Sequence, residues 1–279
     1  MNIHQTVEFL QTLPALPKIA QDILSINLAS DAGDELLLKL IAKDPPISAR
    51  VIGLANSPIF HTSRKILTVN DASAVLGIKR IKMISLSFAM VASMTRKPPG
   101  SLDTTALGQH GMAVSLAMEV LSRAMPHDRR PPDEELYLAG LLHNIGFLVL
   151  DYTEPVISNR FHARLAAEDG RIASTELEAQ ILEVNHCELG ALLAEHWNLT
   201  ANIIAVIRHH HHIPDNSGES VANTLIAMTC IAQRLLPTFG AHELSPPPIQ
   251  AKEWQALGIT DVETDELVSA MRACLHAMT

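Results

Sequence analysis

Apolar residues recur at helical spacing through almost the whole chain, and this periodicity constrains the fold more than any other feature of the sequence. After Pro17, for example, Ile19, Ile23 and Ile26 follow one another at intervals of three or four residues, which places them on one helix face. No stretch alternates apolar and polar residues over the length of a strand. Since 47% of the residues are hydrophobic, the chain can also bury a substantial core. We therefore expect an all-α globular fold.

Helix start and stop signals support this interpretation in the first part of the chain. Asp44 followed by Pro45 predicts an N-cap and a first helical residue, because aspartate accepts from an unpaired backbone N–H and proline has none to leave unpaired. Gly77 is expected to end a short helix, since glycine adopts a positive φ without steric cost. The next helix is predicted from Ile78 to about Met94.

Proline-rich breaks divide the chain into lobes. The linker Lys97-Pro98-Pro99-Gly100-Ser101 cannot continue a helix, so we predict an N-terminal helical lobe over residues 1–100 and a second helical lobe over residues 101–240. Three further prolines precede a C-terminal helical extension over residues 241–279, which is expected to pack on the body. The helices expected in the second lobe are Thr104–Met125, Glu134–Leu150, Pro155–Glu168, Thr175–Glu183, His186–Trp197, Ala201–His210 and Ser220–Leu236.

Charge and composition disfavour several function classes. The chain has 21 Lys and Arg against 30 Asp and Glu, a net charge of −9, and only 4% aromatic residues, so direct nucleic-acid binding is not expected. The longest apolar runs, Met83–Met94 and Leu136–Leu150, are shorter than the roughly 20 residues that a membrane helix needs, so no membrane association is expected. Three cysteines without a CxxC pair favour a cytoplasmic location.

The most informative feature of the composition is the high number of histidines, 14 against two Tyr and two Trp. His110 and His143 lie in apolar helical segments, and His143 is followed by Asn144, so this polar pair must find partners inside the protein. His186 opens a predicted helix, and the run His209-His210-His211-His212 closes another. Imidazoles from separate helices are one way to build a metal site in a helical bundle.

A structural interpretation of these histidines stays open beside the functional one. A buried histidine is commonly a hydrogen-bonded core residue, and histidines at a helix C-terminus are favoured by the helix dipole. Cys187, next to His186, can likewise be a core residue or a reactive thiol. The chain contains no glycine-rich phosphate-binding loop and no GxSxG nucleophile motif.

Six short motifs together resemble the HDOD domain, a relative of the HD-type metal-dependent phosphohydrolases. They follow the order and spacing of that family over roughly residues 10–236, which is nearly the whole chain. The resemblance implies a two-lobed helical bundle with an HD-like second lobe. The motifs are Leu13-Pro14-Ala15-Leu16-Pro17, Asp44–Val51, Leu54–Phe60, Leu76-Gly77, His186–Ala194 with Trp197-Asn198-Leu199, and Ile207-Arg208-His209-His210.

The resemblance also implies where a degenerate HD site would lie. HD enzymes use a helix histidine, an adjacent His-Asp pair, further histidines and a late aspartate. The corresponding positions here are His110, His143, Asn144, His186, His209 or His210, and Gln233. Asn144 and Gln233 stand where the family has metal-binding carboxylates, so the pocket is rich in nitrogen and poor for Mg²⁺ or Mn²⁺.

Three functional hypotheses follow from the resemblance. The first is a non-catalytic bacterial signal-transduction protein with no resident cofactor, which contacts histidine kinases, response regulators or cyclic-dinucleotide enzymes as separate chains. The second is a remodelled hydrolase in which three or four of His110, His143, His186 and His209 hold one zinc-like ion, Zn²⁺ or Ni²⁺. The third is a non-hydrolytic nucleotide sensor, with Arg208 as a candidate contact for a phosphate group.

Overall fold

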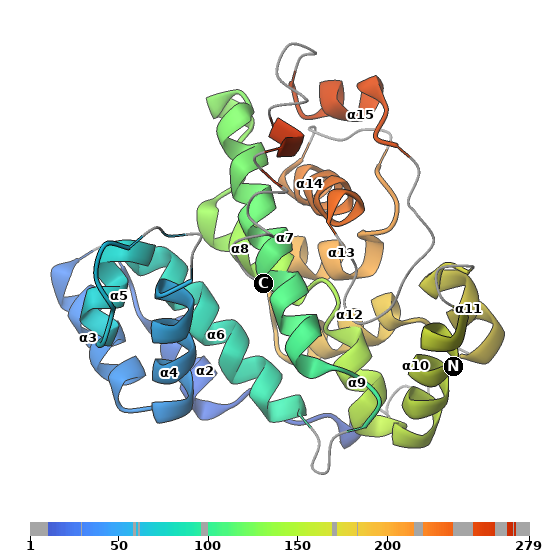
Figure 1. Cartoon of the computed structure of the whole chain (residues 1–279), viewed down its shortest axis with the longest axis horizontal. Helices are drawn as coiled ribbons and strands as arrows, with labels where there is room; N and C mark the ends of the chain where they lie inside the picture. The colour runs from blue at the N-terminus through green and yellow to red at the C-terminus, as the bar shows by residue number, and fades with distance from the viewer. Residues whose placement is uncertain are drawn as a thin grey trace. The chain divides into compact units, whose positions relative to one another are not determined.

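The computed structural model describes residues 11–28, 30–57, 60, 62–95, 100–168, 172–182, 184–214, 220–236, 248–259, 267–269 and 271. Every regular element within these residues is a helix, as the sequence predicts (Figure 1). The chain divides into two compact units, and we describe each by itself. Among the described residues, one unit contains residues 16–93 and the other contains residues 11–15 and 94–271.

The unit of residues 16–93 is a small helical group in which α3, α4 and α5 pack against one another. Asp44 caps α4 as predicted, because its side chain accepts a hydrogen bond from the backbone N–H of Ile47 at 3.0 Å. Gly77 separates α5 from α6 with a φ of 81°, a conformation that favours glycine. The helices are α2 (Lys18–Ser25), α3 (Asp31–Ala42), α4 (Pro45–Ala55), α5 (Val69–Leu76) and α6 (Ile78–Met94).

The larger unit is a bundle built around α7, α8, α12, α13 and α14. The helix α7 packs along α8 and α14, while α12 packs against both α9 and α13 (Figure 1). The indole N–H of Trp197 donates to the backbone oxygen of Pro14 at 2.9 Å, which attaches residues 11–15 to this unit. Its helices are α7 (Thr104–Ala124), the 3-10 helix η2 (His127–Arg129), α8 (Asp133–Leu142), α9 (Gly146–Thr153), α10 (Pro155–Glu168), α11 (Ser174–Ile181), α12 (His186–His196), α13 (Ala201–His209), α14 (Val221–Leu235) and α15 (Ala251–Ala256).

The sequence prediction of one helix over residues 134–150 is wrong. This segment contains two helices, α8 and α9, which meet at an angle of 41° across His143, Asn144 and Ile145. Apolar residues continue through the break, so periodicity alone does not reveal it. Within the described residues no single helix is long and apolar enough to cross a membrane, although α8 and α9 together meet that test by length and composition.

The C-terminal region contains a short helix that the sequence prediction did not place. The backbone N–H of Gln250 donates to the Glu253 carboxylate at 2.6 Å, which caps the start of α15. Further along, Leu267 and Met271 are buried. Much of the predicted extension, including residues 241–247 and 260–266, lies outside the described residues.

Candidate functional site

Two glycines allow three helices to approach closely around the α8–α9 break. A Cβ atom on Gly146 would lie 1.8 Å from the backbone oxygen of His186, and one on Gly190 would lie 2.8 Å from Cγ2 of Ile207. The N-terminus of α9 therefore lies directly against the N-terminus of α12, and α12 lies against α13. The ring of Phe147 stacks on the ring of His186, with centroids 4.1 Å apart and an interplanar angle of 14°.

Five histidine rings form a continuous group at this point. The ring centroids of His110 and His143 are 5.3 Å apart, and those of His143 and His210 are 5.1 Å apart. His186 lies 5.3 Å from His210 and 5.1 Å from His211 by the same measure. His143, His186 and His210 are each 0% exposed, so the group lies in the interior of the unit. We call the five residues the histidine cluster: His110, His143, His186, His210 and His211.

Backbone oxygens fix the orientation of two rings in the cluster. Nδ1 of His143 lies 2.8 Å from the backbone oxygen of Gly140, and Nδ1 of His210 lies 2.9 Å from that of Ile207. A carbonyl oxygen only accepts hydrogen bonds, so each Nδ1 carries the proton. The Nε2 atom of each neutral ring then presents a lone pair.

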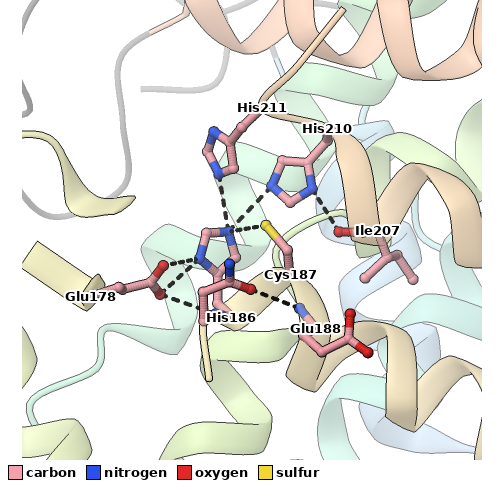
Figure 2. Close-up of polar contacts among 8 residues, drawn as sticks. Glu178, His186, Cys187, Glu188, Ile207, His210 and His211 are labelled. Carbon is pink, nitrogen blue, oxygen red and sulfur yellow. Dashed lines mark hydrogen bonds and ion pairs between the residues drawn. The ribbon is translucent and has the colours of Figure 1, made fainter. Parts of the chain in front are cut away.

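A buried carboxylate orients the third ring. Both carboxylate oxygens of Glu178 lie 2.8 Å from Nδ1 of His186, and one of them also accepts from the His186 backbone N–H at 3.2 Å (Figure 2). Glu178 comes from α11 and is 0% exposed. Burial lowers the pKa of His186, but the Glu178 carboxylate and Cys187 outweigh it, and the net effect raises that pKa.

The imidazoles of His143, His210 and His211 are neutral at physiological pH. Burial, together with the charge of His110, lowers the pKa of His143 well below its ordinary value. Burial and the charge of His211 do the same for His210. Burial and the charge of His186 lower the pKa of His211 to about 3. The cluster is therefore a group of nitrogen lone pairs around one ring paired with a carboxylate.

Cys187 joins the cluster through its sulfur atom. Sγ lies 3.5 Å from Nε2 of His186, and that Nε2 is also 3.3 Å from Nε2 of His210 and 3.1 Å from Nε2 of His211 (Figure 2). One nitrogen or sulfur atom from each of these four residues lies within 4.8 Å of the other three. Cys187 is a free cysteine and is buried.

Comparison with protein families gives the evolutionary context of this site. The model of the HDOD domain matches residues 13–213, which include the whole histidine cluster. The chain belongs to the HDOD family. The match covers most of the chain and confirms the resemblance that the sequence motifs indicate.

Relatives of this HDOD chain share its fold at low identity. An uncharacterized protein of Treponema pallidum is 27% identical over 204 residues, which cover 71% of this chain and 38% of that protein. The chain therefore spans well under half the length of that relative. An HDOD domain protein of unknown function from Geobacter sulfurreducens superposes with a TM-score of 0.72 at 22% identity, covering 100% of this chain and 99% of that chain.

Two further solved structures have the same fold. A proposed signal transduction protein from Marinobacter aquaeolei VT8 superposes with a TM-score of 0.73 at 25% identity, covering 100% of this chain and 61% of that one. A proposed phosphohydrolase from Shewanella amazonensis SB2B has a TM-score of 0.69 at 22% identity, covering 98% of this chain and 94% of that one. These similarities confirm the all-α HDOD fold.

Asn144 and Gln233, the two positions expected to have lost carboxylates, adjoin residues of the histidine cluster. Oδ1 of Asn144 and Nε2 of His143 are buried and have no hydrogen-bond partner in the described part of the chain. The side-chain amide of Gln233, on α14, donates to the backbone oxygen of His210 at 2.6 Å. Gln233 therefore holds the end of α13 and directs its N–H group, rather than an anionic oxygen, at the cluster residue.

Two of the predicted site residues do not join the cluster. His209 is exposed at the end of α13, and its expected place among the ligands is taken by His210 and His211. Arg208 is the second of these residues. Its guanidinium donates to Glu188 at 2.9 Å and to Glu195 at 2.9 Å, so these carboxylates occupy the group that was expected to contact a phosphate.

The side chains present do not fit a pair of oxygen-ligated metal ions. Asn144 offers a neutral amide oxygen, and both oxygens of Glu178 are taken up by His186. Mg²⁺ and Mn²⁺ prefer carboxylate and water oxygens, whereas imidazole and thiolate ligands select ions such as Zn²⁺. The sequence reasoning missed Glu178 because it is one acid among several in a polar helix, and only the fold brings it to His186.

Proposed function

We propose that this HDOD chain is a non-catalytic signal-transduction protein that acts through contacts with other proteins. The observation that carries the proposal is the neutral Asn144 beside His143, where the HD enzymes that the chain resembles have a metal-binding aspartate. Without that carboxylate the site lacks the charge and the oxygen ligand that would hold two hydrolytic ions.

Burial of the cluster supports the same proposal. Metal-assisted hydrolysis needs a metal-bound water and an open position where the phosphate ester can bind. His143, His186 and His210 are each 0% exposed, so their rings offer no surface to a substrate. A core of this kind suits a role in stability or in conformational signalling better than turnover.

The proposed partners are signalling proteins: histidine kinases, response regulators or cyclic-dinucleotide enzymes. Membership of the HDOD family supports this class of partner, and so does the structural likeness to the proposed signal transduction protein of Marinobacter aquaeolei VT8. This chain covers 61% of that protein.

The test combines turnover and binding measurements on the full chain. Tag-free protein is assayed on phosphomonoesters, phosphodiesters and nucleotides with added Zn²⁺, Mn²⁺ or Ni²⁺, and we expect rates equal to the protein-free control. The same protein is then immobilised against purified kinases, response regulators and cyclic-dinucleotide enzymes from its own organism. Saturable binding of at least one of them is expected. Hydrolysis that is lost in His186→Ala would overturn the proposal, and so would the absence of binding to every protein in the panel.

A nucleotide-sensing role is the second candidate, and it is favoured by the polar atoms of His143 and Asn144 that have no hydrogen-bond partner within the described residues. The engagement of Arg208 by two glutamates weighs against it. Thermal-shift screening with cyclic dinucleotides and mononucleotides separates the two roles, since a bound ligand stabilises the native state. A concentration-dependent rise in Tm that Asn144→Ala removes would favour the sensor.

A further inference from the structure

We propose that His186, Cys187, His210 and His211 form a closed four-coordinate site for one zinc-class transition ion, with Glu178 as the positioning residue for His186. The inference goes beyond the proposed signalling function. It also differs in its ligands from the histidine-only set that the sequence predicts, because Cys187, His210 and His211 replace His110, His143 and His209.

The distances between the donor atoms match a tetrahedral ion. Zinc binds imidazole nitrogen at about 2.0–2.1 Å and thiolate sulfur at about 2.3 Å, so tetrahedral angles place two nitrogens about 3.3 Å apart and a nitrogen and a sulfur about 3.6 Å apart. Nε2 of His186 lies 3.3 Å from Nε2 of His210, 3.1 Å from Nε2 of His211 and 3.5 Å from Sγ of Cys187. The three distances from His186 Nε2 thus already match tetrahedral spacing, and the other three pairs of donor atoms lie within 4.8 Å of each other.

Hydrogen bonds behind the rings direct the donor atoms inward. Glu178 accepts from Nδ1 of His186, and the backbone oxygen of Ile207 accepts from Nδ1 of His210 (Figure 2). Metal-binding histidines typically donate their other ring N–H to a carboxylate or a backbone carbonyl, which fixes the tautomer and the ring orientation. Two of the three proposed imidazole ligands have this support.

The charge of the site also fits a divalent ion. On binding, Cys187 loses its thiol proton and His186 loses the proton on Nε2, and the resulting thiolate together with the Glu178 carboxylate supplies two negative charges against the two positive charges of the ion. A buried charge is tolerated when it is paired in this way. Without an ion, Nε2 of His186 lies within hydrogen-bond distance of Nε2 of His210, so a bound ion takes the place of the proton that these two rings share.

Four protein ligands make the site structural rather than catalytic. Catalytic zinc sites keep one coordination position for water or substrate, whereas structural sites are closed by the protein. His186 and Cys187 begin α12, and His210 and His211 follow α13, so a bound ion links the start of one helix to the end of the next. Such a link stabilises this part of the unit without giving it hydrolytic activity.

Cobalt titration tests the proposal on the full chain after removal of any purification tag. We expect one Co²⁺ per chain, a visible spectrum typical of tetrahedral cobalt and a sulfur-to-cobalt charge-transfer band in the near ultraviolet. Cys187→Ser should lose the charge-transfer band, whereas Cys230→Ser, a substitution of the other described buried free cysteine, should keep it. His211→Gln should abolish tetrahedral binding, whereas His209→Gln, at an exposed position of the same run, should not.

Two further measurements keep the test decisive if Cys187→Ser fails to fold. In the wild-type protein, Zn²⁺ should slow alkylation of Cys187 at least tenfold relative to chelator, as read by peptide mass spectrometry. Glu178→Gln should weaken Co²⁺ binding about 10–100-fold with an unchanged charge-transfer band, as expected of a residue that acts through a ligand.

Binding with no charge-transfer band, no stoichiometric binding, or an equal loss with His209→Gln would overturn the site. The hydrolysis and partner assays remain independent of these results, so the proposed function is tested separately.

Discussion

Glu178 holds the imidazole of His186 through both of its carboxylate oxygens, each 2.8 Å from Nδ1, and both residues are 0% exposed. The pair joins α11 to the start of α12. Because both partners are buried, removing one of them leaves the other without its partner in the interior, which should cost more than breaking a surface ion pair.

Replacement of Glu178 by Gln should therefore destabilise the protein. The amide keeps the shape of the side chain but has no charge to pair with His186, and we expect a loss of about 1–3 kcal/mol in the free energy of unfolding. Urea denaturation without added metal measures it. Glu176→Gln, at an exposed position of the same helix, should change stability by less than about 0.5 kcal/mol. Equal effects of the two substitutions would contradict the role assigned to Glu178.

Gly146 should tolerate no larger side chain. A Cβ atom there would lie 1.8 Å from the backbone oxygen of His186 and 2.9 Å from the backbone nitrogen of Gly190, and neither atom can move without shifting a helix. Gly146→Ala should cost at least about 3 kcal/mol. Gly108→Ala, where nothing lies within 4 Å of the added atom, should stabilise α7 by about 0.4–1 kcal/mol. Thermal unfolding compares the two, and a mild effect at Gly146 would mean that the helices do not meet as described.

His162 should make stability sensitive to acid. Burial lowers its pKa from 6.5 to about 4, so below pH 6.5 the unfolded chain binds a proton that the folded chain does not. The contribution of His162 to the free energy of unfolding is complete above pH 6.5 and is lost as the pH falls through 4, by about 3 kcal/mol in total. His162→Leu should remove that part of the slope. Unfolding curves between pH 7 and pH 4 measure it, and an unchanged difference between wild type and variant at all pH values would contradict the assignment.

Asn144→Asp should test the neutral position beside His143. Oδ1 of Asn144 is buried without a hydrogen-bond partner among the described residues, so a charge there should destabilise the metal-free protein by about 1–3 kcal/mol. A divalent ion should recover part of the loss, because a carboxylate adds an oxygen ligand and a charge. Asn70→Asp, on the exposed surface of α5, is the matched control. Identical melting temperatures of Asn144→Asp with zinc, manganese and chelator would exclude a metal at this position.

Helix positions could be predicted from the sequence where local signals decide them. Asp44 caps α4, and Gly77 separates α5 from α6, because a short-range hydrogen bond and a positive φ act within a few residues. The break after Leu142 could not be predicted in this way. It coincides with the close approach of Gly146 to His186, which are 40 residues apart in the chain, and no local pattern encodes that contact.

The candidate site could also be predicted only in part from the sequence. The family motifs indicated His143, His186 and the end of α13, and the structure brings these rings together. The choice of His211 over His209 depends on which way the chain turns after α13. The contact of Glu178 with His186 depends on where the fold places α11, so only the tertiary structure identifies Glu178 as part of the site.

Turnover by the metal-loaded wild-type protein tests the central claim most directly, namely that the histidine cluster is a closed, non-catalytic core. Tag-free protein reconstituted with one equivalent of Zn²⁺ is assayed on phosphomonoester, phosphodiester and nucleotide substrates, with His186→Ala as the matched control. We predict no difference between the two proteins or between either of them and buffer. Saturable hydrolysis by the wild type that His186→Ala abolishes would contradict the account.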